Sequence, residues 1–169
     1  MIEKCYGILD DPDLIYGEGC LDDLKDCIND ALHRGATCFM LADMGEFCAG
    51  AYKICKTLQQ KGKYSFTITV ISAKLKDINV INRYKDDNIL FVYSEVPSSY
   101  HFTMSKINQF IINNAFKCFS FSDDMKYFNR LTTGEFYIIN PTHCKEHYFS
   151  AKEKIVNEPF DNADICLLE

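Results

Sequence analysis

The chain has 169 residues, of which 47% are hydrophobic and 25% are charged, a length and composition typical of one globular domain. Its net charge of -6 excludes a general nucleic-acid-binding protein, because such a protein needs a basic surface to neutralise phosphates, whereas a small anionic ligand needs only a few local donors. No apolar run approaches the roughly 20 residues that span a bilayer, so we expect no association with membranes.

The first half of the chain alternates between apolar runs, typical of buried strands, and apolar stripes at helical spacing. These patterns predict, in chain order, a strand at 5–9, a helix at 21–32, a strand at 37–41, a helix at 47–58 and a strand at 64–71. Gly35 and Gly62 are expected to end the two helices. Such an alternation implies a parallel sheet with right-handed crossovers.

The second half carries weaker signals. Residues 74–88 are polar and predict no element, while 89–93 predicts a strand or extended segment and 95–99 a loop. Further patterns predict a helix at 101–114, a strand at 115–121, a short helix at 123–131, a last strand at 136–139 and a weak helix at 150–156. We therefore predict a three-layer α/β/α Rossmann-like domain with a mostly parallel sheet over residues 1–142. Residues 143–169 are expected to form a C-terminal extension that packs on the domain or trails from it.

Cysteine is unusually frequent. The nine cysteines form an odd number, contain no Cys-x-x-Cys pair, and lie mostly in apolar segments, where cysteine behaves as a small hydrophobic residue. The first residues are not followed by the apolar segment of a signal peptide. We therefore expect reduced, buried thiols in a cytoplasmic protein rather than a disulfide framework.

Several short motifs follow the predicted strands at regular places. They are Gly7-Ile8-Leu9-Asp10, Gly45-Glu46-Phe47-Cys48, Val96-Pro97 before a helix with Ile107-Asn108, and Leu131-Thr132-Thr133-Gly134. In the order and spacing of these motifs, over about residues 3 to 141, the chain resembles the SLOG superfamily. The closest likeness is to a YpsA-like group of small bacterial proteins. This resemblance implies a small nucleotide-like ligand and favours a homodimer.

The chain departs from the family pattern at the charged positions. Where that pattern has a His and an Arg after the first strand, an Arg in the third helix and an Asp in the second turn, this sequence has Ile8, Leu9, Ile107 and Cys48. Guanidinium groups grip anions through two parallel hydrogen bonds, which aliphatic side chains cannot replace. A nucleotide held by the family's usual contacts would therefore bind poorly.

We place the candidate binding site at the carboxyl ends of the strands, where the sheet order reverses. The residues expected to converge there are Gly7, Asp10, Gly45, Glu46, Cys48 and Asn108, and the resemblance adds Thr132, Thr133 and Gly134 from a reduced phosphate loop. The turn at Gly45 either presents backbone N–H groups to an anionic ligand or only permits a tight turn before a helix. Asn108 either hydrogen-bonds a ligand or caps the loop after the first strand.

Reactive roles are less favoured. Glu46 is the best candidate for a catalytic acid or base, because the resemblance places a glutamate near the sugar, but a solvated residue at a helix start is the commoner arrangement. Cys48 is more plausible as a structural thiol than as a reactive one. His143 and His147 stand four residues apart without a third ligand at metal-site spacing, and the acidic turn 10–13 is typical of a solvated loop. We expect no metal and no cofactor.

Three functions stay open at this point. The first is a non-catalytic or degenerate SLOG-like domain that binds a small nucleotide-like ligand. The second is a hydrolase of LOG-like type acting on a nucleotide or an N-glycosidic bond, with Glu46 as the acid or base. The third is a protein–protein interaction module whose pocket has closed over Ile8, Leu9 and Ile107.

Overall fold

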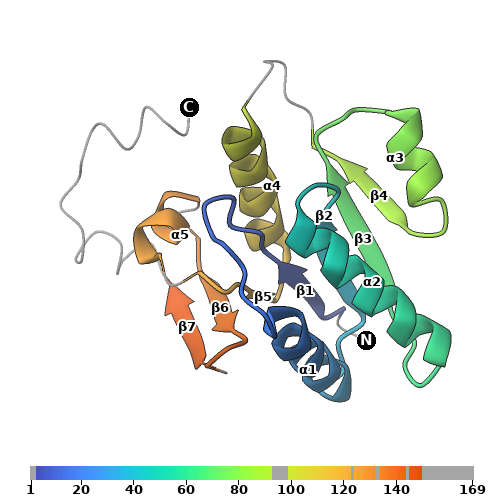
Figure 1. Cartoon of the computed structure of the whole chain (residues 1–169), viewed down its shortest axis with the longest axis horizontal. Coiled ribbons are helices and arrows are strands. Elements are labelled where there is room, and N and C mark those ends of the chain that lie inside the picture. Colours follow the sequence, from blue (N-terminus) through green and yellow to red (C-terminus); the bar gives the residue numbers. More distant parts are fainter. Residues whose placement is uncertain (1–2, 93–98, 123, 132–133, 144, 150–169) are drawn as a thin grey trace.

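The computed structural model describes residues 3–92, 99–122, 124–131, 134–143 and 145–149. Strands and helices alternate along most of this chain (Figure 1). The elements are β1 (Cys5–Ile8), α1 (Cys20–His33), β2 (Cys38–Ala42), α2 (Glu46–Lys61), β3 (Thr67–Ser72), α3 (Ile78–Arg83), β4 (Asn88–Phe91), α4 (Tyr100–Asn114), β5 (Lys117–Phe119), α5 (Met125–Leu131), β6 (Phe136–Asn140) and β7 (Lys145–Phe149).

The strands form one sheet of seven, in the order β4-β3-β2-β1-β5-β6-β7. Every neighbouring pair is parallel except β6 and β7, which are antiparallel. The chain builds β2, β3 and β4 on one side of β1 and then returns to build β5 and β6 on the other side. The order of the sheet therefore reverses between β1 and β5, which is the place where ligands bind in many open α/β sheets.

Helices cover both faces of the sheet, so the predicted three-layer α/β fold with a mostly parallel sheet is confirmed. The helices α1 and α2 pack against each other, while α4 packs across β1, β2, β3 and β5 and contacts α5 (Figure 1). Right-handed crossovers place α1 and α2 on one face and α4 and α5 on the other, because the chain moves along the sheet in opposite directions in its two halves. The central strands are accordingly buried on both sides.

The close packing of α4 explains one of the glycines. A Cβ atom on Gly7, which lies in β1, would collide with the side chains of Ile111 on α4 and Cys118 on β5. Glycine at this position lets the helix backbone approach the sheet. Gly7 is thus buried beneath a helix rather than at an open strand tip.

Local signals located most of the remaining elements, including the helix ends at Gly35 and Gly62. The polar stretch 74–88, however, contains α3, whose start is capped by Asp77: its Oδ1 accepts hydrogen bonds from the N–H groups of Asn79 and Val80 at 2.8 and 3.4 Å. Residues Lys145–Phe149, within the expected C-terminal extension, add β7 to the edge of the same sheet. The weak helix predicted at 150–156 lies outside the described residues.

The seven cysteines in the described ranges are free thiols, and five of them are buried: Cys5, Cys38, Cys48, Cys55 and Cys118. Cys144 and Cys166 lie outside those ranges. None of the described helices combines the length and the apolar character that crossing a bilayer requires.

Candidate functional site

The N-terminus of α2 is occupied by a carboxylate of the chain itself. Gly45 stands at the N-cap, where it has no side chain to cap the helix, and the backbone N–H of Cys48 donates to Oδ2 of Asp10 at 3.4 Å. Asp10 follows β1 and is only 4% exposed. The carboxylate lies at the positive end of the helix dipole, where an anionic ligand would otherwise bind.

Asp10 is also held by Tyr16, from its own loop, and by Asn108, from α4. The Tyr16 hydroxyl donates to Oδ1 of Asp10 at 3.1 Å and accepts from the backbone N–H of Asp11 at 2.9 Å. The Asn108 amide, from α4, donates to the backbone carbonyl oxygen of Asp10 at 2.9 Å and to the Tyr127 hydroxyl at 2.8 Å. Of the two roles open to Asn108, the structure has it capping the loop after β1. Its Oδ1 is buried and has no hydrogen-bond partner in the part of the chain that the structure describes.

Burial dominates the electrostatics of Asp10 and Asp43, two carboxyl groups beside the start of α2. It raises the pKa of Asp10, and the hydrogen bonds from Tyr16 and from the Cys48 N–H oppose this only in part. Burial also raises the pKa of Asp43, the first residue after β2, against the hydrogen bond that the Ser72 hydroxyl donates to its Oδ2 at 2.7 Å. Both groups therefore bind a proton more readily in the folded chain than in the unfolded chain.

This shift predicts how stability changes with pH. A carboxyl group whose pKa is higher in the folded chain than in the unfolded chain stabilises the fold at low pH. This contribution is fully present below the unfolded pKa of about 4, and it is lost as the pH rises through the pKa of the folded chain. The substitution Asp10→Asn keeps the shape of the side chain and an acceptor for the Cys48 N–H, but it removes the titrating group. We therefore expect the variant to lose less stability than the wild type as the pH rises. Urea unfolding at a series of pH values measures this, with Asp30→Asn at an exposed position as control. Equal pH dependence of Asp10→Asn and the wild type would contradict the prediction.

Three aromatic rings pack together beside the point where the sheet order reverses. Tyr16, from the loop after β1, stacks on Phe47 of α2 with ring centroids 4.3 Å apart and planes 1° apart. Phe121, from the segment after β5, meets both rings edge-on at 6.0 and 5.2 Å. Phe47 and Phe121 are buried. We call these three residues the aromatic plug.

The aliphatic side chains at positions 8, 9 and 107 belong to the same interior. Ile8 and Ile107 are fully buried and Leu9 is 1% exposed, all three within the hydrophobic core. They pack the core instead of lining an open pocket. Together with the aromatic plug, they fill the interior around β1 with packed side chains. A separate hollow of about 340 Å³ lies between the loop after β1, at Pro12 and Asp13, and the helices α4 and α5.

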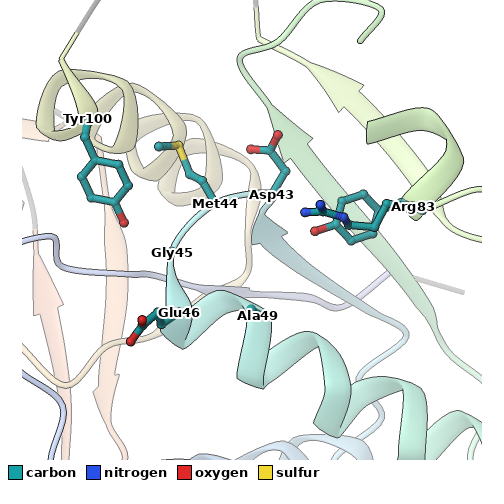
Figure 2. Close-up of a pocket in the computed structure, with 8 residues that line it drawn as sticks. Asp43, Met44, Gly45, Glu46, Ala49, Arg83 and Tyr100 are labelled. Carbon is teal, nitrogen blue, oxygen red and sulfur yellow. The ribbon is translucent and has the colours of Figure 1, made fainter. Parts of the chain in front are cut away.

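An open hollow lies one strand away, at the carboxyl ends of β2 and β3. Its volume is about 460 Å³, and its lining combines the start of α2 with the end of α3 and the start of α4: Asp43, Met44, Gly45, Glu46, Ala49, Arg83, Tyr84 and Tyr100. Figure 2 shows Tyr100 and Arg83 on opposite sides of this hollow, with Gly45 between them. A Cβ atom on Gly45 would meet the Asp10 carboxylate and lie 3.1 Å from the Tyr100 hydroxyl, so the glycine lets these groups approach the turn.

The hollow contains two of the residues that the sequence singled out, Gly45 and Glu46. Asp10, Cys48 and Asn108 are buried and do not line it. Gly134 is exposed before β6, and Thr132 and Thr133 lie outside the described residues. The sequence analysis missed three residues of the hollow that can recognise a ligand, Asp43, Arg83 and Tyr100. Only Asp43 carried a signal, as an acidic residue directly after a buried strand.

The candidate reactive residues gain little from the structure. Burial raises the pKa of the Cys48 thiol well above its ordinary value, and the nearby Asp10 carboxylate raises it further, so the reactive thiolate is disfavoured. Glu46 lines the hollow, but it forms no ion pair with any of the residues described. A general acid without a positioned partner is a weak catalyst.

His143 and His147 are not part of a metal-binding cluster among the described residues. Within the described ranges, which omit Cys144, no three His, Cys, Asp or Glu side chains gather closely enough to hold a metal ion.

Comparisons with known proteins add no identification: no family model, no curated protein and no solved structure matches this chain.

Proposed function

We propose that this chain is a degenerate SLOG-like domain that binds a small nucleotide-like ligand without catalysing a reaction, and that the ligand occupies the hollow at the ends of β2 and β3. One observation carries the proposal: Asp43, Arg83 and Tyr100, from three separate parts of the chain, border one open hollow beside the start of α2. The aromatic plug supports the displaced position, because its rings pack together where the segments after β1 and β5 meet α2.

Each of the three side chains matches one part of such a ligand. The Tyr100 ring, 43% exposed, offers a surface on which a base can stack. The Arg83 guanidinium suits a phosphate group. A carboxylate after the second strand, here Asp43, suits ribose hydroxyls, as in dinucleotide-binding folds. Because Asp43 and Glu46 add two acidic groups beside one arginine, a nucleoside or a monophosphate fits better than a triphosphate.

The closed-pocket module is the competing function, and the aromatic plug is the observation that favours it. The two functions differ in how nucleotides affect thermal stability. A ligand-binding domain is stabilised by its nucleotide, whereas a module with a closed pocket gains no stability from nucleotides. A homodimer also stays a prediction from the resemblance, and light scattering of the purified protein checks it.

Thermal unfolding with adenosine, AMP and ATP tests the binding proposal. A ligand that binds only the folded state adds about 2.7 kcal/mol of stability at a hundred times its dissociation constant. We expect adenosine or AMP to raise the Tm more than ATP does. Arg83→Gln should weaken the response to AMP but not to adenosine, and Tyr100→Leu should weaken both.

The matched control is Arg34→Gln, which removes an arginine from an exposed ion pair with Asp30 at the end of α1 and should leave both responses intact. The proposal fails if none of the three compounds raises the Tm. It also fails if Arg83→Gln and Tyr100→Leu respond as the wild type does.

A further inference from the structure

Another cavity lies near the opposite edge of the sheet, formed by β6 and β7, on the face that α5 covers. Its volume is about 620 Å³. The polar side chains around it are Ser122, Asn140, His143, Lys145 and His147, and its apolar wall includes Phe128 and Phe149. In the sheet order, β1 and β5 separate β6 and β7 from the hollow over β2 and β3.

The alternation of side chains along β7 sorts the charges around this cavity. Lys145 pairs with Asn140 and His147 with Ile138 in the register with β6, and all four side chains line the cavity. The residue between them, Glu146, faces away, because successive side chains of a strand point to opposite faces. Its carboxylate accepts hydrogen bonds from Lys117 Nζ at 3.0 and 2.9 Å.

The cavity is consequently free of acidic side chains among the residues known to line it, although the whole chain carries a net charge of -6. One lysine and two histidines supply its N–H donors, from the end of β6 through β7. Lysine is charged at neutral pH, and histidine donates a hydrogen bond whether it is neutral or protonated. This combination favours an anion over a cation.

Two buried polar groups complete the cavity. Asn140 is 3% exposed and is held by the loop around it, since its Oδ1 accepts from the backbone N–H of Thr142 at 3.0 Å. Ser122 is also buried, and its hydroxyl oxygen accepts from the backbone N–H of Asp124 at 3.2 Å. A hydroxyl that accepts one hydrogen bond can still donate its proton, so Ser122 offers a further donor.

We propose that this cavity binds a phosphoryl oxyanion, either free phosphate or the phosphate of a small monoester. Lys145 supplies the charge, His143, His147 and Ser122 supply hydrogen-bond donors, and the rings of Phe128 and Phe149 accommodate an apolar ester group. The site goes beyond the nucleotide-like ligand proposed above, because it uses none of the residues of that hollow.

The experiment titrates the full chain with inorganic phosphate and, separately, with phenyl phosphate, at constant ionic strength maintained by chloride. NMR signals of the histidine rings report binding residue by residue. We expect saturable shifts at His143 and His147 and none at His33. If phenyl phosphate binds more tightly than inorganic phosphate, a monoester is the better ligand. If the two bind equally, the ligand is free phosphate. Either result supports the site.

Variants give the decisive comparison. Lys145 is exposed, so Lys145→Gln should fold normally, and it should weaken phosphate binding by about tenfold, as expected for the loss of one charged hydrogen bond. The matched control, Lys53→Gln on the exposed face of α2, should bind as the wild type does. Arg83→Gln should also leave this binding unchanged, which separates the site from the nucleotide-like function.

The proposal is overturned if neither compound shifts the signals of His143 and His147. Unchanged affinity in Lys145→Gln, or an equal loss in Lys53→Gln, also overturns it, because either result means that general charge and not this cavity attracts the anion.

Discussion

Replacing Phe47 by alanine is expected to lower the free energy of unfolding by about 3–5 kcal/mol, the usual cost of removing a buried phenylalanine ring. Phe47 is 4% exposed and stands at the centre of the aromatic plug, where it stacks on Tyr16 and receives the edge of Phe121. Its removal leaves a cavity between α2 and the segments after β1 and β5, and it also removes the aromatic contacts.

Urea unfolding of the variant and the wild type measures this loss. Phe116→Ala is the matched control, because that ring is 47% exposed and should cost clearly less. Phe47→Leu, which fills most of the space, should recover part of the stability. If Phe47→Ala proved no costlier than Phe116→Ala, the plug would not be a packed part of the core, and the crevice at the reversal of the sheet order would be open to ligands.

Replacing Gly45 by alanine should cost about 3 kcal/mol, from two sources that each contribute about 1–3 kcal/mol. The backbone at Gly45 has φ 92° and ψ 140°, a conformation that residues with a Cβ atom rarely adopt. In addition, the new Cβ would collide with the Asp10 carboxylate that caps α2. The substitution therefore strains the turn and displaces the cap together.

Two other glycines separate these sources. Gly19 also has a positive φ, 84°, but a Cβ there meets nothing within 4 Å, so Gly19→Ala measures backbone strain alone. Gly17 has open space and no positive φ, so Gly17→Ala should be nearly neutral. Chemical denaturation should rank the losses with Gly45→Ala largest and Gly17→Ala smallest. A loss at Gly45 that merely equals the loss at Gly19 would mean that Asp10 does not lie against the turn.

The packing around β1 changes how the aliphatic residues in the candidate motifs are interpreted. Aliphatic residues at positions 8, 9 and 107 first suggested a binding site that had lost its charges. In the structure these side chains are core residues, and the carboxylate of Asp10 takes the place that an anion would have at the start of α2. The side chains at these positions and the rings of Phe47 and Phe121 thus belong to one packed core.

Local sequence signals predicted the α/β alternation, because buried strands and amphipathic helices each impose a periodicity on a few neighbouring residues. The same locality explains what was missed. The six residues of α3 are too few to show a helical stripe within a polar stretch, and β7 is an edge strand with mostly exposed side chains. Gly45 and Glu46 were correctly placed after the second strand, since the end of a strand can be read from the sequence.

The tertiary structure decided which of these strand ends is open. Asp10 reaches Cys48 across 38 positions of sequence, and Asn108 reaches Asp10 across 98, so no local pattern could show that they fill the start of α2 and the crevice. Arg83 and Tyr100 border the same hollow as Asp43 only because β3 and β4 lie beside β2 and α4 crosses the sheet. Strand order and helix crossing bring together side chains from distant parts of the chain, and the periodicity of a single segment contains no information about its neighbours in space.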